Sequence, residues 1–467
     1  MTAEQNKGKK GISYWRTKAE SRRKECKRLK IEVCRLRRSR EIWRSRYKEE
    51  RKKSICIERV KGHRYSLQLM YLGIVMHISH NISLRSVCAT LKQIGRLQGV
   101  CFERLSATTV RNWSIRLGLY YLSRQPMSGN YALIVDESVS IGQEKILLIL
   151  GVCLSDKMSR IAPLRMQDIQ VLHVGSQTSW KGVDLSALLN EWQNKPGFEI
   201  AYAIADGAHN LKHGLNLSQI PWVYDCSHVV SNLIRKMFEK DECLNTLVKH
   251  LNTTRTLWPS CQWAVYMPPS MRKKARFHQV LSLHAWANTM LDHFDQLPAP
   301  VQHGLAYLKQ YQELIHTLKT LSLLAENFFT IFKAKGINTH TIKQWHQQVE
   351  QICQNSVTQD PKINTFKNAL DLYLQHTIRD LPDQHQIICC SDVIESIFGK
   401  YKNKPGSRMI SQDILKIPAF AQNIDMQHVK HAMMSTSNQA VQDWAQLKTV
   451  PSLLALKRKI YKQLLAA

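Results

Sequence analysis

The sequence Tyr131-Ala-Leu-Ile-Val-Asp136 decides the interpretation of this chain, because a run of apolar and β-branched residues leads directly into a single acid. A second apolar run, Ile146–Val152, follows closely, and turn-forming residues stand before the first run (Gly129-Asn130) and between the two (Gly142-Gln143). Apolar runs bounded in this way are typical of buried strands in a covered sheet. The carboxylate of Asp136 either caps the next turn or faces a positive partner, because burying an unpaired charge is costly.

The same arrangement recurs downstream. Three further strands are predicted at Gln167–Val174, Ile200–Asp206 and Trp222–Asp225, and helices at Val183–Trp192, His209–Leu217 and Val229–Phe238. Like the first strand, Ile200–Asp206 ends in an acid, here followed by a glycine. From about 240 to 385, apolar residues recur at threes and fours, which indicates a helical region.

A third acid follows this helical region. In Cys389-Cys-Ser-Asp-Val-Ile-Glu395, Ser391 is a candidate N-cap for a helix that carries Glu395 in its first turns, where the helix dipole favours a carboxylate. Lys402 lies seven residues after Glu395 and hence on the same face. We therefore expect Lys400 and Lys402 to hold a phosphate beside a metal that Glu395 holds.

Composition indicates a polyanionic partner. The 467 residues have room for several domains, and the formal net charge is +30. Residues 1–64 alone hold 24 Lys or Arg against 8 Glu, a net charge of +16. No run is long and apolar enough for a membrane span, no signal peptide opens the chain, and the scattered cysteines favour reduced thiols. A cytoplasmic protein associated with the bacterial nucleoid is expected.

The N-terminal arm is predicted to be one long helix from residue 12 to about 60. Residues at alternating spacings of four and three form a candidate a/d seam: Trp15, Ala19, Arg22, Cys26, Leu29, Val33, Leu36, Arg40, Trp43 and Tyr47. Two interpretations stay open. The arm is either a solvated charged helix or a coiled coil that dimerises and presents Arg and Lys to phosphates.

Residues 65–122 predict a small helical domain. Its last helix has Ser106 as N-cap and Gly118 as its end, with Val110, Trp113 and Leu117 facing inward. The side chains expected to face outward, and to contact DNA bases, are Thr108, Arg111, Asn112 and Arg116. This unit resembles the helix-turn-helix of many bacterial transposases.

Asp136, Asp206 and Glu395 in this order resemble the Asp-Asp-Glu triad of transposases with a ribonuclease H-like core. The helical insertion before Glu395 is similar to that of the hAT and Mutator-like superfamilies, and Asp225-Cys-Ser-His228 is similar to their Cys/Asp-x-x-His motif. The resemblance covers roughly 130–402. It implies an α/β ribonuclease H-like core whose first and fourth strands lie side by side, a large all-α insertion, and DNA cleavage and strand transfer at transposon ends.

Such chemistry uses two Mg²⁺ ions, for which Mn²⁺ can substitute, and hard cations prefer carboxylate oxygens. His228 is expected to act beside the metals rather than on them, Glu137 to point to the opposite face of the sheet, and Asp225 to be the substitute should Asp206 not serve. A competing hypothesis is zinc at Cys226, His228, Cys389 and Cys390. Two other functions stay open: a transposase-derived DNA-binding protein that no longer cuts, and a structure-specific nuclease of the same fold.

In the superfamilies that the chain resembles, the insertion supplies an aromatic that stacks on a base at the transposon end. Trp258 is the first candidate and Trp263 the second, because they flank a loop just ahead of the basic residues Arg272 and Lys273. Trp286 and Trp345 lie in helical patterns and are expected in the core.

The predicted architecture therefore has six parts. They are a basic coiled-coil arm (1–62), a helix-turn-helix domain (63–125), the first part of the catalytic core (126–239), the all-helical insertion (240–385), the helix of the catalytic Glu (386–404) and a basic helical C-terminal region (405–467). The expected partner is double-stranded DNA, bound by a homodimer or higher oligomer, with no membrane association.

Overall fold

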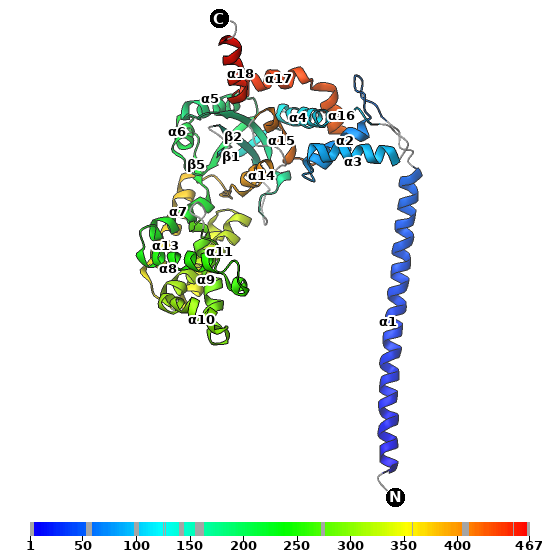
Figure 1. The fold of residues 1–467 in the computed structure, drawn as a ribbon, viewed down its shortest axis with the longest axis vertical. Coiled ribbons are helices and arrows are strands. Elements are labelled where there is room, and N and C mark those ends of the chain that lie inside the picture. Colours follow the sequence, from blue (N-terminus) through cyan, green and yellow to red (C-terminus); the bar gives the residue numbers. More distant parts are fainter. Residues whose placement is uncertain are drawn as a thin grey trace. The chain divides into compact units, whose positions relative to one another are not determined.

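The computed structural model describes residues 4–52, 58–97, 102–124, 126, 128–139, 144–154, 163–271, 276–356, 358–403, 411–451 and 453–464. The chain divides into two compact units, 1–59 and 60–467. The first unit consists of the 49-residue helix α1 (Glu4–Lys52), drawn in blue in Figure 1. Within the described part of the chain, none of the helices combines the length and apolarity that a bilayer crossing demands.

The second unit is mixed α/β and is built on one five-stranded sheet. Its strands are β1 (Gly129–Val139), β2 (Lys145–Leu154), β3 (Gln170–Gln177), β4 (Phe198–Ala205) and β5 (Trp222–Tyr224). The order across the sheet is β3-β2-β1-β4-β5. Strand β2 runs antiparallel to both β1 and β3, whereas β4 is parallel to both β1 and β5. All five strands were predicted from the sequence, with ends that differ by up to three residues.

Alternation along β1 sorts its side chains onto two buried faces. Leu133 and Val135 pack into one cluster with residues of α5 (Gly182–Gln193) and α6 (His209–Leu217). Ile134 packs into the other cluster, on the opposite face. Because successive strand residues point to opposite faces, Asp136 continues the face of Ile134 and Glu137 continues that of Val135.

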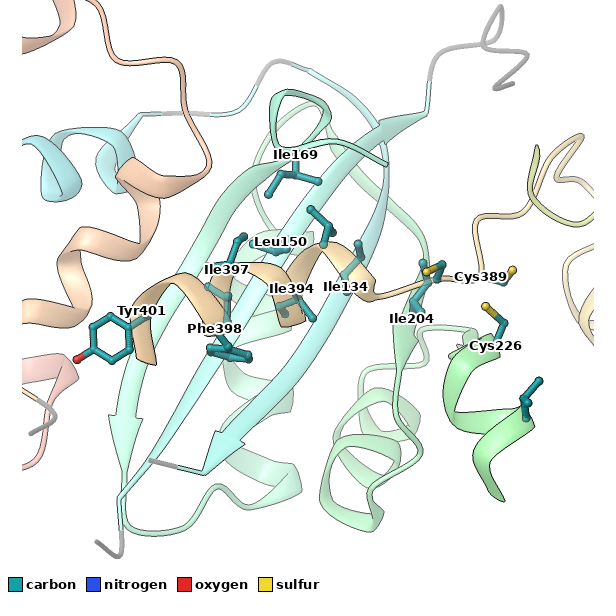
Figure 2. Close-up of a cluster of buried hydrophobic side chains, with 14 of the residues drawn as sticks. Ile134, Leu150, Ile169, Ile204, Cys226, Cys389, Ile394, Ile397, Phe398 and Tyr401 are labelled. Carbon is teal, nitrogen blue, oxygen red and sulfur yellow. The ribbon is translucent and has the colours of Figure 1, made fainter. Parts of the chain in front are cut away.

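Helix α14 (Asp392–Lys402) covers the face of Ile134. Its apolar residues Val393, Ile394, Ile397, Phe398 and Tyr401 recur at spacings of one and three and are all buried. Figure 2 shows Ile394 and Ile397 directed at the side chains of Ile134 and Leu150. This packing fixes Glu395, which is on the outer side of the helix, with respect to the sheet.

The helical insertion follows α7 (Cys226–Phe238). It comprises α8 (Glu242–Leu257), η2 (Gln262–Tyr266), α9 (Arg276–Asp292), η4 (Phe294–Gln296), α10 (Ala299–Leu305), η5 (Ala306–Tyr311), α11 (Gln312–Lys335), α12 (Thr339–Gln354) and α13 (Pro361–Asp380). Two polar contacts tie it to the core. The Tyr373 hydroxyl donates to the Tyr224 carbonyl at 2.8 Å, and Lys333 Nζ lies 2.6 Å from the Asp392 carboxylate.

Three helices precede the sheet in the sequence: α2 (Leu67–Ile78), α3 (Leu84–Leu97) and α4 (Ala107–Ser123). The short helix η1 (Met166–Asp168) lies between β2 and β3. Ser106 caps α4 as predicted, accepting the Thr109 N–H. Gly118, however, does not end the helix. It lies inside α4, where the Leu415 carbonyl oxygen comes so close that a Cβ on residue 118 would be 1.4 Å from it.

The C-terminal segment covers α4. It consists of η6 (Gln412–Lys416), α15 (Ile417–Phe420), α16 (Met426–Ser435), α17 (Asn438–Lys448) and α18 (Leu453–Leu464). Elements η6, α15, α16 and α17 all contact α4, and α17 also contacts β3. The C-terminal segment therefore joins the predicted DNA-binding helices to the sheet.

This packing corrects the prediction that Arg111 and Arg116 face outward. Arg111 pairs with the half-buried Asp413 at 3.0 Å, and Arg116 donates to the main-chain carbonyls of Met433 (2.8 Å) and Thr436. Asn112 is half-buried, whereas Thr108 is exposed as predicted. The face of α4 that was predicted to contact DNA bases is therefore largely covered by the C-terminal segment, which lies about three hundred positions later in the chain.

Candidate active site

Strand register brings Asp136 and Asp206 together. The last pair between the parallel strands β1 and β4 is Ile134 with Ile204, and each acid lies two residues beyond its member of that pair. Both acids therefore lie two residues beyond the last β1–β4 pair and on the same face of the sheet. One detail of the prediction was wrong: β1 does not end at Asp136 but continues to Val139, because Asp136 still pairs with Leu148 of β2.

Asp136 is largely buried and experiences the charges of the other two acids. Its Oδ1 accepts the N–H of Glu137 at 2.7 Å. Burial, and after it the negative charges of Asp206 and Glu395, raise the pKa of Asp136 to about 7, although the Glu137 N–H and His228 act in the opposite direction. The Asp206 carboxylate accepts the Ala208 N–H at 2.9 Å. The three acids thus form one electrostatically coupled group with excess negative charge.

His228 joins this group from α7. Its Nε2 lies 3.7 Å from Oε1 of Glu395 on α14, and the side chain of Glu395 is 60% exposed. The Glu395 carboxylate is the main cause that raises the pKa of His228 to about 9, against the effect of burial, and Asp225 and Asp206 act in the same direction as Glu395. A protonated imidazole therefore stands beside the acids.

Asp225 links the two helices that carry His228 and Glu395. It is fully buried, and it is the N-cap of α7: its Oδ1 accepts the His228 N–H at 2.9 Å, while Oδ2 accepts the Ser391 N–H at 2.6 Å at the start of α14. Because both oxygens are engaged in this link, Asp225 is a structural residue and not a substitute for Asp206. Asp is a preferred N-cap residue, and its side chain accepts the backbone N–H three residues later, which here belongs to His228. Sequence reasoning overlooked this signal.

The cysteines form a cluster that differs from the predicted zinc ligands. Ligand atoms of Asp225, Cys226 and Cys390 all lie within 4.8 Å of one another, and all three residues are buried. His228 is directed to Glu395 instead. Hydrogen bonding to Cys389 and burial raise the pKa of the Cys226 thiol, and hydrogen bonding to Cys226 together with burial does so for Cys390. The set of Cys226, His228, Cys389 and Cys390 is therefore not assembled as a four-ligand site.

Glu137 points away from the acids, as predicted. Its carboxylate lies 3.1 Å from Lys145 Nζ and accepts from the side-chain amide of Asn210 on α6. The two predicted lysines of α14 are exposed. Lys402 shares the face of Glu395, whereas Lys400, five residues on, lies about 140° around the helix. Lys402 therefore lies on the side of α14 that carries Glu395, and the role of Lys400 stays a prediction.

The tryptophan candidates separate by burial. Trp258, the first choice, is wrong, because its ring is only 8% exposed and packs against Gly304 of α10. Trp263 of η2 is half-buried at the edge of the core. Trp345 is fully buried and donates to Asp371, and Trp286 is half-buried and donates to the Tyr266 carbonyl, so both belong to the core as predicted. Arg272 and Lys273 lie outside the described residues.

Comparison with protein-family profiles and curated sequences identifies no relative of the chain.

Proposed function

We propose that this protein is a DNA transposase with an Asp-Asp-Glu active site formed by Asp136, Asp206 and Glu395. The observation that carries the proposal is the convergence of the three acids and His228, which come from β1, the end of β4, α14 and α7. These residues are up to 259 positions apart in the sequence, so their meeting is a property of the fold.

The topology supports a ribonuclease H-like core. Three antiparallel strands are followed by two parallel ones, and β1 lies beside β4. In the fold that the sequence resembles, carboxylates at the ends of these two strands form the centre of the site. The third acid follows an all-helical segment, again as the resemblance implies.

The donor set fits divalent cations of the Mg²⁺ type. All three acids offer hard carboxylate oxygens, and the raised pKa of Asp136 reflects negative charge that a cation would neutralise. Asp136, Asp206 and Glu395 would hold two Mg²⁺ or Mn²⁺ ions. When bound, these ions activate the attacking oxygen and stabilise the leaving oxygen of a phosphodiester.

The protein's own groups then orient the substrate. His228, protonated beside Glu395, donates a hydrogen bond to a scissile phosphate oxygen or keeps Glu395 in place. Lys402, on the face of Glu395, neutralises an adjoining phosphate. A 3′-hydroxyl in place of water as the nucleophile gives strand transfer instead of hydrolysis. The proposed partner is double-stranded DNA, bound by a homodimer or higher oligomer, in accordance with the net charge of +30.

The test is excision of a marked DNA segment bounded by the sequences that flank the gene. Asp136→Asn, Asp206→Asn and Glu395→Gln keep side-chain size but remove charge, so we expect each to abolish excision while gel-shift affinity for DNA is kept. Asp383→Asn, at an exposed acid outside the site, is the matched control and should excise normally.

Three other results separate the alternatives. Excision at the wild-type rate by any of the three variants would remove that residue from the site. DNA binding without cleavage by the wild type would favour the transposase-derived binding protein. Cleavage of branched DNA without excision would favour the structure-specific nuclease.

A further inference from the structure

Helix α1 exposes an apolar seam along its length. Among the described side chains from Tyr14 to Ser45, all but Lys18 are exposed, including Leu29 (49%), Val33 (44%) and Leu36 (61%). Helices in proteins gain most of their stability from packing an apolar face against a neighbour. The described seam side chains of this 49-residue helix are exposed, and an exposed apolar seam favours a partner.

The seam has heptad spacing and can be assigned position by position. Five residues take position d and five take position a: d is Trp15, Arg22, Leu29, Leu36 and Trp43, and a is Ala19, Cys26, Val33, Arg40 and Tyr47. Side chains of residues 46–52 are not described, so Tyr47 enters by sequence alone. The same assignment fixes the flanking positions e and g, whose charges set partner and orientation in coiled coils.

The flanking charges distinguish the two possible orientations. Position e is basic in every heptad: Arg16, Arg23, Lys30, Arg37 and Arg44. Position g is mixed: Lys18, Glu25, Glu32, Ser39 and Arg46. In an antiparallel pair, e faces e and the basic rows repel. In a parallel pair, g faces the partner's e five residues later, which places Glu25 against the partner's Lys30 and Glu32 against the partner's Arg37.

From this charge pattern we infer that α1 forms a parallel, in-register coiled coil with α1 of a second copy of the chain. By symmetry the two Glu–basic pairs occur twice, at the centre of the seam, where Leu29, Val33 and Leu36 supply the apolar layers. Arg22 and Arg40 weaken the seam, but their long side chains can turn outward and leave the guanidinium in solvent. Both chains then leave the coiled coil at the same end.

The two cysteines of the described seam region provide a matched test. Cys26 takes position a and would meet the partner's Cys26 in the seam, whereas Cys34 takes position b and would face solvent; both are exposed in the single chain. Full-length protein is oxidised with diamide, which takes up the two thiol hydrogens as the disulfide forms. Covalent dimers are then measured on non-reducing gels. We expect wild type and Cys34→Ser to cross-link, and Cys26→Ser to lose at least nine-tenths of the dimer.

Dimers that persist in Cys26→Ser and disappear in Cys34→Ser would overturn the register. Charge variants test the pairing itself by light scattering: Glu25→Lys with Glu32→Lys, and separately Lys30→Glu with Arg37→Glu, should each lose dimer, and an equimolar mixture should regain it. Failure of the mixture to dimerise would overturn the inference. None of these readouts involves DNA cleavage, so their failure would leave the proposed catalytic function standing.

Discussion

At the residue scale, Asp136 is a largely buried acid on which burial and the negative charges of Asp206 and Glu395 outweigh the opposite effect of His228. Its pKa of about 7 in the folded protein lies above the ordinary value of 3.8, mainly because of burial. A raised acid pKa means that stability is fully present below about pH 4 and is lost as pH rises through 7. In the metal-free protein, Asp136 therefore opposes folding at neutral and alkaline pH.

Asp136→Asn should consequently unfold at a higher temperature than the wild type at pH 8 in EDTA, and at a similar temperature near pH 4. Mg²⁺ at pH 8 should raise the melting temperature of the wild type more than that of the variant. Thermal unfolding across pH 4–9 measures both effects. Asp383→Asn, the exposed control, should show the melting temperatures of the wild type. A difference in melting temperature between Asp136→Asn and the wild type that is the same at every pH would contradict the raised pKa of Asp136.

His228 offers a second residue-scale prediction. Because Glu395 is the main cause of its raised pKa of about 9, Glu395→Gln should move the titration of the His228 ring toward its ordinary range near 6.5. NMR of the imidazole carbon-bound protons of metal-free protein follows this directly, with the exposed His80 as internal reference. An unchanged His228 midpoint in Glu395→Gln would show that the two side chains do not interact in solution.

At the element scale, the strands and many helix ends were predictable because local pattern decides them. Helix α6 occupies the predicted residues, and Ser106 caps α4 as predicted, whereas Ser391 takes the N-cap position of α14 without a side-chain hydrogen bond. The surroundings of α4 were not predictable. Its Arg111 and Arg116 look like surface residues in the sequence, and their burial depends on the C-terminal segment, whose docking no local pattern records.

The same limit explains the tryptophans and Asp225. Trp258 lies next to Pro259 in a stretch that reads as a loop, yet it packs on Gly304, a contact that needs the fold of the whole insertion. Asp225 was recognised as part of a motif, but its second contact, to Ser391, crosses 166 positions of sequence. The convergence of Asp136 and Asp206 could be anticipated, because it follows from the resemblance and from strand order alone.

Gly118 tests the docking of α4 on the C-terminal segment. A Cβ at this position meets the Leu415 carbonyl, which is main chain and cannot swing aside, so Gly118→Ala should lower the free energy of unfolding by about 1–3 kcal/mol or more. Gly399→Ala is the matched control, because nothing lies within 4 Å of its Cβ position in α14 and alanine favours helix by about 0.5–1 kcal/mol. Urea unfolding compares the two, and a neutral or stabilising Gly118→Ala would contradict the packing.

At the scale of the whole molecule, positive charge is concentrated in the arm. Residues 1–64 account for +16 of the net +30. Each Lys or Arg that neutralises a DNA phosphate contributes roughly 0.9 to the slope of log K against log salt concentration. Deleting residues 1–62 should therefore weaken DNA binding and reduce that slope by several units, as measured by fluorescence anisotropy between 50 and 300 mM salt. A slope identical to that of the full chain would mean that the arm is a solvated or protein-binding helix that does not contact DNA.

The central claim is that three acids distant in sequence form one divalent-cation site, and iron-directed backbone cleavage tests it without knowledge of the DNA substrate. Fe²⁺ replaces Mg²⁺, and ascorbate with peroxide generates hydroxyl radicals that cut the polypeptide beside the bound iron; mass spectrometry locates the cuts. We predict cuts next to Asp136, Asp206 and Glu395 that excess Mg²⁺ suppresses and that Asp136→Asn abolishes. Cuts confined to the neighbourhood of Cys226 and Cys390, or cuts that Asp136→Asn leaves unchanged, would contradict the account.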